Sequence, residues 1–315
     1  MIVGVSPAIR RALALAERYA RTRLPILVVG ATGTGKEVLA QHIHERSGRP
    51  GMLVDVNCGA LPRDMVESLL FGHRRGAFTG AVESTTGYVE RSDGGTLFLD
   101  ELASLELPAQ SKLLRVLDTG YVEQLGAVAK RRVDLRVVGA ALDTMAGAVA
   151  GGQFRRDLFQ RLAGVLIELP PLTKRREDVI PLAEHFAQAQ GQNLEPAVND
   201  VLLNYEWPGN VRELQMAIER AGELVEDGTL SASAVVEAIK LGQLGQGRSP
   251  CGTGLRAFGR AEILAALSGN DWDAKRAAAD LGVGRTTFFK RLREVGLSLR
   301  AERAFTSSRA FSERG

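Results

Sequence analysis

The sequence has few cysteines, no long apolar run and little net charge, and these shortages exclude whole classes of protein. Only two of its 315 residues are cysteine, Cys58 and Cys251, which is too few for a disulfide framework or a cysteine-based zinc site. No apolar run approaches the roughly 18 residues that a membrane-spanning helix needs. Arg10 and Arg18 interrupt the apolar stretch that a signal peptide would keep uncharged. We therefore expect a reduced, cytoplasmic protein without a membrane span.

The small overall charge is distributed unevenly along the chain. Forty lysines and arginines face 37 aspartates and glutamates, for a net charge of +3. Residues 251–315 hold twelve basic and seven acidic side chains and carry +5, so the first 250 residues carry −2. A basic segment on a nearly neutral body is a common footprint of nucleic-acid binding, although basic tails often bind nothing specific.

Short apolar runs alternate with helical patterns through the first half of the chain. The composition, 45% hydrophobic and 24% charged, is that of a globular protein, and the length allows about two domains. Ser6-Pro7 is typical of a helix start. Helices are expected at 7–20, after residue 36, at 108–118 and at 154–162. Strands are expected at 25–30, 52–57, 96–100, 135–141 and 164–169. This alternation predicts an α/β fold with a parallel sheet.

The pattern changes after Pro170-Pro171 and becomes helical, at 177–190, 197–205, 211–225 and 231–240. Glycine, serine and proline are then concentrated at 242–254, as in a flexible linker. We expect five segments: an α/β unit at 1–172, a helical unit at 173–241, the linker at 242–254, a small helical domain at 255–297, and a basic, disordered tail at 298–315.

A glycine-rich stretch follows the first expected strand and precedes a helix, which is the context that a phosphate-binding P-loop requires. Glycines let successive backbone N–H groups turn toward phosphate oxygens, and the helix N-terminus adds its positive end. Lys36 would reach the β and γ phosphates, and Glu37 stands where a serine or threonine usually follows. The candidate nucleotide-binding residues are Gly30, Ala31, Thr32, Gly33, Thr34, Gly35, Lys36 and Glu37.

A second acidic feature ends the apolar strand at 96–100. Asp100 is a candidate ligand for Mg²⁺, and Glu101 is a candidate to polarise the water that attacks the γ-phosphate of ATP. The alternative is that both carboxylates cap a surface loop, which the P-loop upstream makes the weaker interpretation.

Six residues between these two motifs make the family recognisable: Gly76, Ala77, Phe78, Thr79, Gly80 and Ala81. This hexapeptide resembles the signature loop of the sigma-54-dependent transcription activators, a branch of the AAA+ ATPases, and the resemblance extends from Gly4 to Leu297. A glutamate after the P-loop lysine is usual in that family. The alternative for the hexapeptide is a glycine-rich turn with Phe78 buried in the core.

The resemblance implies a ring, a homo-hexamer or a hetero-oligomer with a paralogue, that hydrolyses ATP and remodels sigma-54 RNA polymerase through the hexapeptide. It implies that Asn57 holds Glu101 inactive until ATP binds, and that Arg212 in the lid senses the bound phosphates. Arg155 and Arg161 match the arginine-finger segment and would act on the neighbouring subunit's ATP, where such fingers are worth roughly 10³–10⁵ in rate. Salt bridging on a helix surface is the alternative for either arginine.

One position departs from the family pattern. Members usually have a polar Thr-Asn pair at the end of the fourth core strand, where this chain has Ala141 and Leu142. Neither side chain can make a hydrogen bond, so we expect weaker coupling between hydrolysis and a second pore loop at about residues 125–133, with ATP binding retained.

The last helical segment has helix-turn-helix spacing, with Ala278 and Gly282 four residues apart. It is similar to the Fis-type domain of these activators, which implies binding to double-stranded enhancer DNA, and such domains usually dimerise. The alternative is a three-helix module that binds no DNA. The candidate DNA contacts are Arg285, Thr286, Thr287, Lys290 and Arg291.

Two further readings compete with this one. A AAA+ replication or transposition factor, or an unfoldase, would share the P-loop and the acidic pair but lack the hexapeptide. A DNA-binding regulator that no longer uses sigma-54 is favoured by Ala141-Leu142 and opposed by the intact hexapeptide. Because the first core segment starts at Ile2, we expect no N-terminal sensor domain and regulation, where present, by a separate protein.

Overall fold

The computed structural model of the protein describes residues 2–244 together with 266–267, 273–274, 276–277 and 288. The expected domain at 255–297, with its five candidate DNA contacts, lies almost wholly outside the described residues. Contacts between Cα atoms divide the chain into two compact units. The first unit contains residues 1–182 and 209–213, and the second contains residues 183–208 and everything after 213.

A five-stranded parallel sheet forms the centre of the first unit, with the strand order β2-β3-β6-β1-β7. The strands are β1 (Ile26–Val29), β2 (Leu53–Asn57), β3 (Thr96–Asp100), β6 (Arg136–Ala141) and β7 (Val165–Glu168). They lie within one residue of the five ranges expected from the apolar runs. The parallel α/β fold is therefore confirmed.

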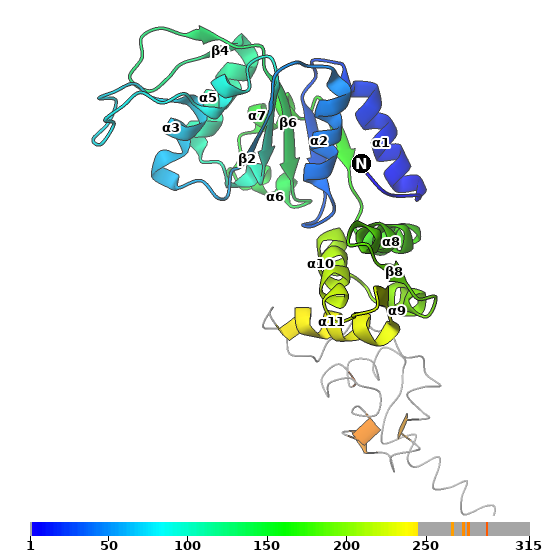
Figure 1. Ribbon diagram of the computed structural model, residues 1–315. Helices are drawn as coiled ribbons and strands as arrows, with labels where there is room; N and C mark the ends of the chain where they lie inside the picture. The colour runs from blue at the N-terminus through cyan, green and yellow to red at the C-terminus, as the bar shows by residue number, and fades with distance from the viewer. Residues whose placement is uncertain (1, 245–265, 268–272, 275, 278–287, 289–315) are drawn as a thin grey trace, which may run out of the picture. The chain divides into compact units, whose positions relative to one another are not determined.

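Helices cover both faces of this sheet (Figure 1). They are α1 (Pro7–Ala20), α2 (Lys36–Ser47), α3 (Val66–Phe71), α4 (Tyr88–Arg91), α5 (Leu107–Thr119), α6 (Met145–Ala150) and α7 (Arg156–Leu162). Ile26 and Val28 pack with α1 and α2, whereas Leu27 packs with α5 and α7 on the opposite face. Alternate residues of a strand point to opposite faces, so both faces of β1 are buried and its sequence is continuously apolar.

The predicted start of the first helix is confirmed, and that of α7 is wrong by two residues. Ser6 caps α1, its Oγ accepting a hydrogen bond from the Ile9 backbone N–H at 3.3 Å, and Pro7 is the first helical residue. The expected helix at 154–162 begins at Arg156, because Arg155 is its extended N-cap, with φ −68° and ψ 132°.

The irregular segments of the first unit contain short elements that apolar periodicity does not predict. Four 3-10 turns are Arg63–Met65, Leu102–Ser104, Leu172–Lys174 and Arg176–Asp178. An antiparallel hairpin pairs β4 (Tyr121–Val122) with β5 (Arg131–Arg132). Two-residue strands are too short to show an alternating pattern.

The described part of the second unit, up to residue 244, is mainly helical. Its helices include α9 (Val198–Asn204) and α11 (Ala232–Leu244), while α8 (Val179–Ala189) and α10 (Asn210–Gly222) have their first turns in the first unit. The expectation of a purely helical unit is corrected by a parallel pair of two-residue strands, β8 (Asn193–Leu194) and β9 (Thr229–Leu230). Among the described residues, none of the helices is long and apolar enough to cross a membrane.

Candidate nucleotide-binding site

The carboxyl ends of β1, β2, β3 and β6 meet at one edge of the sheet, where open α/β sheets bind their ligands. The loop from Gly30 to Gly35 leaves this edge after β1 and leads into α2. Its path is anchored to the next strand, because the Gly30 N–H donates to the Ala141 carbonyl at 3.2 Å. Gly35 has φ +102° and no atom within 4 Å of where a Cβ would lie, so the left-handed backbone, and not crowding, favours glycine there.

Glycine is required at position 33 for two separate reasons. Its φ of +77° lies in the left-handed region, which costs other residues roughly 1–2 kcal/mol. A Cβ there would lie 2.3 Å from the Gly209 carbonyl oxygen. The glycine-rich loop therefore packs directly against the segment at residues 209–213.

Lys36 opens α2, and its side chain folds back over the loop. Its Nζ donates to the carbonyls of Gly30 at 2.9 Å and Ala31 at 3.0 Å. Burial lowers the pKa of Lys36, and Asp100, Asp143 and Glu101 oppose that effect while Arg212 adds to it. These charges converge on the end of the loop, as expected for a phosphate-binding lysine with acidic partners. Asp143 was not among the candidates from the sequence.

Asp100 ends β3, and Glu101 follows it in a strained conformation. Glu101 has φ +52°, in the left-handed region that residues other than glycine rarely adopt. Its backbone N–H donates to Asp100 Oδ1 at 2.8 Å. The turn leaves Glu101 exposed and Asp100 half-buried, so both carboxylates are accessible at the sheet edge. Strain of this kind persists where the surrounding structure enforces it, and it clusters at functional sites.

Asn57 ends β2 directly beside β3, in register with Asp100. Its Oδ1 accepts the N–H groups of Gly59 at 2.9 Å and Ala60 at 3.1 Å. A Cβ on Gly59 would lie 2.1 Å from Glu101 Oε2 and 3.3 Å from Asn57 Oδ1. Asn57 and Glu101 thus flank the same glycine, although in the described part of the chain no hydrogen bond joins the two side chains.

The segment 209–213 brings Arg212 to the loop. Asn210 Nδ2 donates to the Thr32 carbonyl at 2.9 Å, and the Arg212 N–H donates to the Gly33 carbonyl at 3.3 Å. Asn210 Oδ1 accepts from the Leu172 N–H at 2.7 Å. Arg212 is therefore a neighbour of the glycine-rich loop, 176 positions away from Lys36 in the sequence.

A buried polar network supports the loop from below. Arg175 Nη2 donates to the Thr34 carbonyl at 2.7 Å. Asp178, with 0% exposure, accepts from the N–H groups of Val5 at 2.6 Å and Ser6 at 2.7 Å, and from Ser6 Oγ at 2.7 Å. Arg175 and Asp178 also interact electrostatically. Sequence reasoning missed both residues, because isolated polar residues leave no periodic signal.

The site offers Asp100 as a carboxylate that could hold Mg²⁺ together with the phosphates of a nucleotide. Among the described residues, no three His, Cys, Asp or Glu side chains form a group that could hold a metal ion. Mg²⁺ is usually held by one or two carboxylates with substrate phosphates and water. Asp100, half-buried and close enough to Lys36 to affect its pKa, fits that role as a single carboxylate donor.

The hexapeptide lies on an extended loop well away from the glycine-rich loop in Figure 1. His73 and Thr85 exchange backbone hydrogen bonds of 3.0 and 2.8 Å at its base, and the Gly76 N–H donates to the Ala81 carbonyl at 2.9 Å. Phe78 is 42% exposed, and its ring packs against His73 with 5.0 Å between centroids. Phe78 is therefore not part of the core, and Thr79 and Gly80 are exposed beside it.

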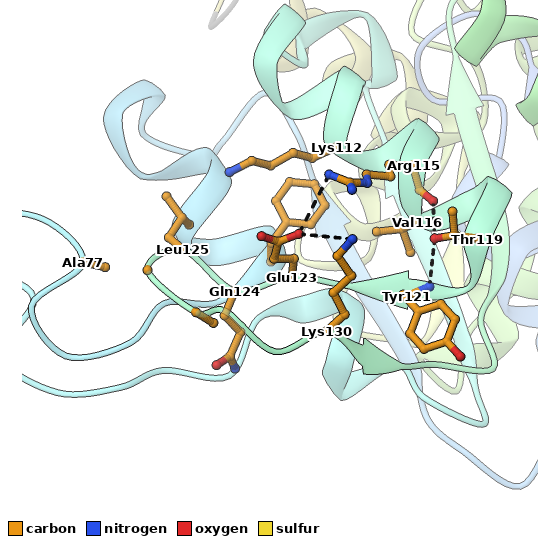
Figure 2. A pocket seen from close by; sticks show the side chains of 13 residues that line it. Ala77, Lys112, Arg115, Val116, Thr119, Tyr121, Glu123, Gln124, Leu125 and Lys130 are labelled. Atoms are coloured by element: carbon orange, nitrogen blue, oxygen red, sulfur yellow. Dashed lines mark hydrogen bonds and ion pairs between the residues drawn. The ribbon is translucent and has the colours of Figure 1, made fainter.

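The loop of the β4–β5 hairpin shares the base of the hexapeptide loop. The Leu125 carbonyl accepts from the Arg74 N–H at 3.0 Å, and Gly126 contacts Ala77. The tip residue Val128 is 99% exposed. A cavity of about 680 Å³ opens beside this base, between α5 and the hairpin (Figure 2), and none of its lining residues belongs to the nucleotide loop. The two loops form one structural assembly.

Charged side chains line that cavity, and two basic residues share the carboxylate of Glu123. Arg115 Nη1 lies 3.9 Å and Lys130 Nζ 4.0 Å from Glu123 Oε2, as Figure 2 shows. Lys112 pairs with Glu67 instead. Such exposed pairs contribute little stability individually.

Arg155 is the N-cap of α7 and Arg161 lies in its last turn, and both form ion pairs with residues of the same chain. Arg155 contacts Asp157 through Nε at 3.1 Å and Nη2 at 2.7 Å, which holds the pKa of Asp157 down at about 2. Arg161 Nε lies 3.2 Å from Asp118 Oδ1. Neither arginine is among the charges that act on the pKa of Lys36.

Ala141 and Leu142, both uncharged, lie at the carboxyl end of β6, at the sheet edge that carries Asp100. Ala141 is 1% exposed and belongs to the core, whereas Leu142 is 43% exposed. The departure from the polar pair is thus located at the carboxyl end of β6, next to the strand that carries Asp100.

Comparison with known families identifies two matching domains. The sigma-54 interaction domain matches residues 2–168, and a AAA+ ATPase lid domain matches residues 173–249. AlgB of Pseudomonas aeruginosa, an alginate biosynthesis transcriptional regulatory protein, is 38% identical over 93% of this chain and 67% of its own length. The Nif-specific regulatory protein of Azotobacter vinelandii is 37% identical over 95% of this chain, which spans only 60% of that relative.

Solved structures agree on the fold. NtrX of Brucella abortus in complex with ATP has a TM-score of 0.67 and 30% identity, over 94% of this chain and 69% of that one. The RuvB branch-migration motor of Thermotoga maritima has a TM-score of 0.50 at 18% identity, over 93% of this chain and 88% of its own, and at that identity only the fold is comparable.

Proposed function

Because this chain belongs to the family of sigma-54-dependent transcription activators with a AAA+ domain, we propose that it hydrolyses ATP to drive sigma-54 RNA polymerase from the closed to the open promoter complex. The observation that carries this proposal is the separation of two features within one unit. Lys36, Asp100, Glu101 and Arg212 converge at the sheet edge, while Phe78 is exposed on a distinct loop.

The glycine-rich loop binds the triphosphate. Its backbone N–H groups and the N-terminus of α2 supply partial positive charge. Lys36 transfers its hydrogen bonds from the Gly30 and Ala31 carbonyls to phosphate oxygens, and Arg212 adds a second full charge from the segment 209–213. Glu37 sits in the first turn of α2, where no hydroxyl is available for the metal.

Glu101 polarises the attacking water and accepts its proton. Asn57 restrains Glu101 beside Gly59, which keeps the carboxylate unproductive until nucleotide rearranges the sheet edge. Asp100 would hold Mg²⁺, which would neutralise charge on the ATP phosphates. A carboxylate and an amide flanking one glycine support this division of roles.

Arg155 and Arg161 act on the ATP of a neighbouring subunit in a homo-hexameric or mixed ring. Neither arginine is among the charges that act on the pKa of Lys36 in the same chain, which supports a role in trans. Each must leave or share its intrasubunit partner, Asp157 or Asp118, to reach the neighbour's phosphates. Helix-surface salt bridging is therefore the resting arrangement rather than a competing role.

The loop carrying Phe78 and Thr79 contacts sigma-54. An exposed aromatic ring on a loop with left-handed glycines at both ends, Gly76 at φ +81° and Gly80 at φ +101°, can extend and retract without disturbing the core. The β4–β5 hairpin moves with it, because Leu125 and Gly126 contact its base.

The segment after residue 241 tethers the motor to double-stranded enhancer DNA. The proposed segments are the ATPase core at 1–172, the lid at 173–241, the linker at 242–254, the DNA-binding domain at 255–297 and the basic tail at 298–315. The +5 charge of residues 251–315 supports DNA contact, with Arg285, Thr286, Thr287, Lys290 and Arg291 as contacts. A protein acting on promoter DNA in a bacterium works in the cytoplasm.

Two substitutions separate hydrolysis from remodelling in a test with the full chain. Glu101→Gln is expected to bind ATP but not hydrolyse it, whereas Thr79→Ala is expected to hydrolyse ATP but not form open complexes with sigma-54 polymerase. Thr173→Ala, at an exposed position of a 3-10 turn away from the hexapeptide, is the matched control for the threonine change. Open-complex formation by Thr79→Ala at the wild-type level contradicts the role proposed for the hexapeptide loop. Absence of sigma-54-dependent opening with the wild-type chain contradicts the proposed function and favours a regulator independent of sigma-54.

A further inference from the structure

The side chain of Gln110, on α5, is completely buried and makes three hydrogen bonds, one to the turn before α5 and two to residues 153–155. Its Nε2 donates to the Leu105 carbonyl at 2.7 Å and to the Gln153 carbonyl at 3.0 Å. Its Oε1 accepts from the Arg155 backbone N–H at 2.8 Å. The chemistry fixes the orientation of the amide, because the reversed amide would place an NH₂ group against an N–H and an oxygen against two carbonyls.

Leu105 ends the turn that begins at Glu101. The Ser104 N–H donates to the Glu101 carbonyl at 2.8 Å, and the Leu105 N–H donates to the Leu102 carbonyl at 3.1 Å. Leu102 is fully buried and packs against β6 at Gly139. The strained backbone of Glu101 is therefore connected to the Gln110 amide through one short, hydrogen-bonded turn.

The same helix contacts Arg155 both at its backbone N–H and at its guanidinium. Gln110 fixes its backbone N–H, at the N-cap of α7, and the next residue, Ser111, accepts from Arg155 Nη1 through its Oγ at 3.0 Å. Helix α5 thus sets where α7 begins and where the guanidinium lies. Asp157 adds a contact from α7 itself.

We propose that Gln110 is a positioning residue that aims Arg155 at the neighbouring subunit's ATP and fixes it relative to the turn following Glu101. This inference rests on the proposed function, because it takes Arg155 as a finger acting in trans. It adds a physical link between Glu101, which acts on the ATP of its own site, and Arg155, which acts on the ATP of the neighbouring site. Movement of Glu101 in one site is transmitted through Leu105 and Gln110 to the finger presented to the next site.

The substitution Gln110→Met tests this, because it keeps the length of the side chain while removing all three hydrogen bonds. Misplacement of a catalytic group by about 1 Å costs about 10²-fold, so ATP turnover is expected to fall by about that factor. Affinity for a fluorescent ATP analogue is expected to stay within about twofold. Gln41→Met is the matched control, because the exposed Gln41 amide hydrogen-bonds, among the described residues, to the exposed Glu45 alone.

Mixed rings locate the defect. Lys36→Ala subunits cannot use ATP but carry an intact finger, so mixing them with Gln110→Met subunits is expected to restore turnover at the Gln110→Met sites. Arg155→Ala subunits supply no finger and are expected to restore nothing. A failure of Lys36→Ala subunits to restore turnover, in rings verified by size, places the damage in the variant's own site and overturns the inference.

A second variant covers the case in which Gln110→Met does not fold. Gln110→Glu retains an acceptor for the Arg155 N–H and loses the two donations, so its turnover is expected to lie between those of Gln110→Met and wild type and to respond to the same mixing. Wild-type turnover in both variants, with Arg155→Ala inactive, refutes the role of Gln110 alone. Wild-type turnover in Arg155→Ala refutes the finger assignment instead.

Discussion

Removing the carboxylate of Asp178 is expected to destabilise the first unit strongly. Asp178 is fully buried and accepts hydrogen bonds of 2.6 to 2.7 Å from the Val5 N–H, the Ser6 N–H and Ser6 Oγ. A hydrogen bond to a charged group contributes about 1.5–3 kcal/mol, and bonds that share one acceptor are not additive. We expect Asp178→Ala to lower the free energy of unfolding by about 3–5 kcal/mol.

Asp178→Asn serves as the graded comparison. The amide keeps an acceptor for the N–H groups but loses the charge that faces Arg175, so we expect a loss of about 1–3 kcal/mol. For a unit of this size, 1 kcal/mol corresponds to about 2–4 °C in Tm. The alanine variant is therefore expected to unfold about 6–20 °C lower than wild type.

Thermal and denaturant unfolding of the full chain, followed by circular dichroism, measures these losses. The double variant Ser6→Ala with Asp178→Ala completes a cycle whose coupling is expected to exceed about 0.5 kcal/mol, as for residues in direct contact. Because Arg175 also binds the Thr34 carbonyl, ATP affinity is expected to weaken in Asp178→Ala. A loss below about 1 kcal/mol, or an additive cycle, would refute the network.

Two further predictions concern the sheet edge. Ala141→Thr with Leu142→Asn is expected to raise the yield of open complexes per ATP hydrolysed, because the double substitution introduces a polar pair at the sheet edge. Unchanged ATPase activity and an unchanged open-complex yield contradict this expectation. Because Ala141 is buried, thermal unfolding of the double variant is the control for its folding. The Cys58 thiol is expected to resist alkylation at pH 8 in the folded protein, assayed with Cys251→Ser. Burial, with Asp100, Glu101 and Asp55 nearby, raises the pKa of Cys58 from 9.0 to about 12. Since the folded pKa exceeds the unfolded value, this contribution to stability is complete below pH 9 and is lost between about pH 9 and pH 12. Rapid alkylation of Cys58 at pH 8 in the folded protein contradicts the raised pKa of this thiol.

Elements with a repeating chemical signal were predictable from the sequence. The five buried strands were located within one residue because fully apolar runs between turns have few alternative structures. The start of α1 was predictable because Ser6 and Pro7 act locally. The glycine-rich loop was predictable because its backbone geometry requires glycine at positions 33 and 35.

Contacts made by single polar residues across long stretches of sequence were not predictable. Ser6 and Asp178 are 172 residues apart, and Gln110 and Arg155 are 45 apart. Nothing local distinguishes these residues from ordinary surface positions. The proximity of Arg212 to the loop was available only through family resemblance. The proposed roles of the site residues stay predictions until they are measured.

The most direct test of the central claim is promoter opening by the purified full chain. Single-strand-specific footprinting of a sigma-54 promoter, with sigma-54 polymerase and either ATP or ADP, measures it. We predict reactive, unpaired bases near the start site when the wild-type chain is supplied with ATP. We predict none when ADP replaces ATP, and none when Glu101→Gln is supplied with ATP. A closed promoter under every nucleotide condition, despite ATP hydrolysis by the wild-type chain, would contradict the proposed function.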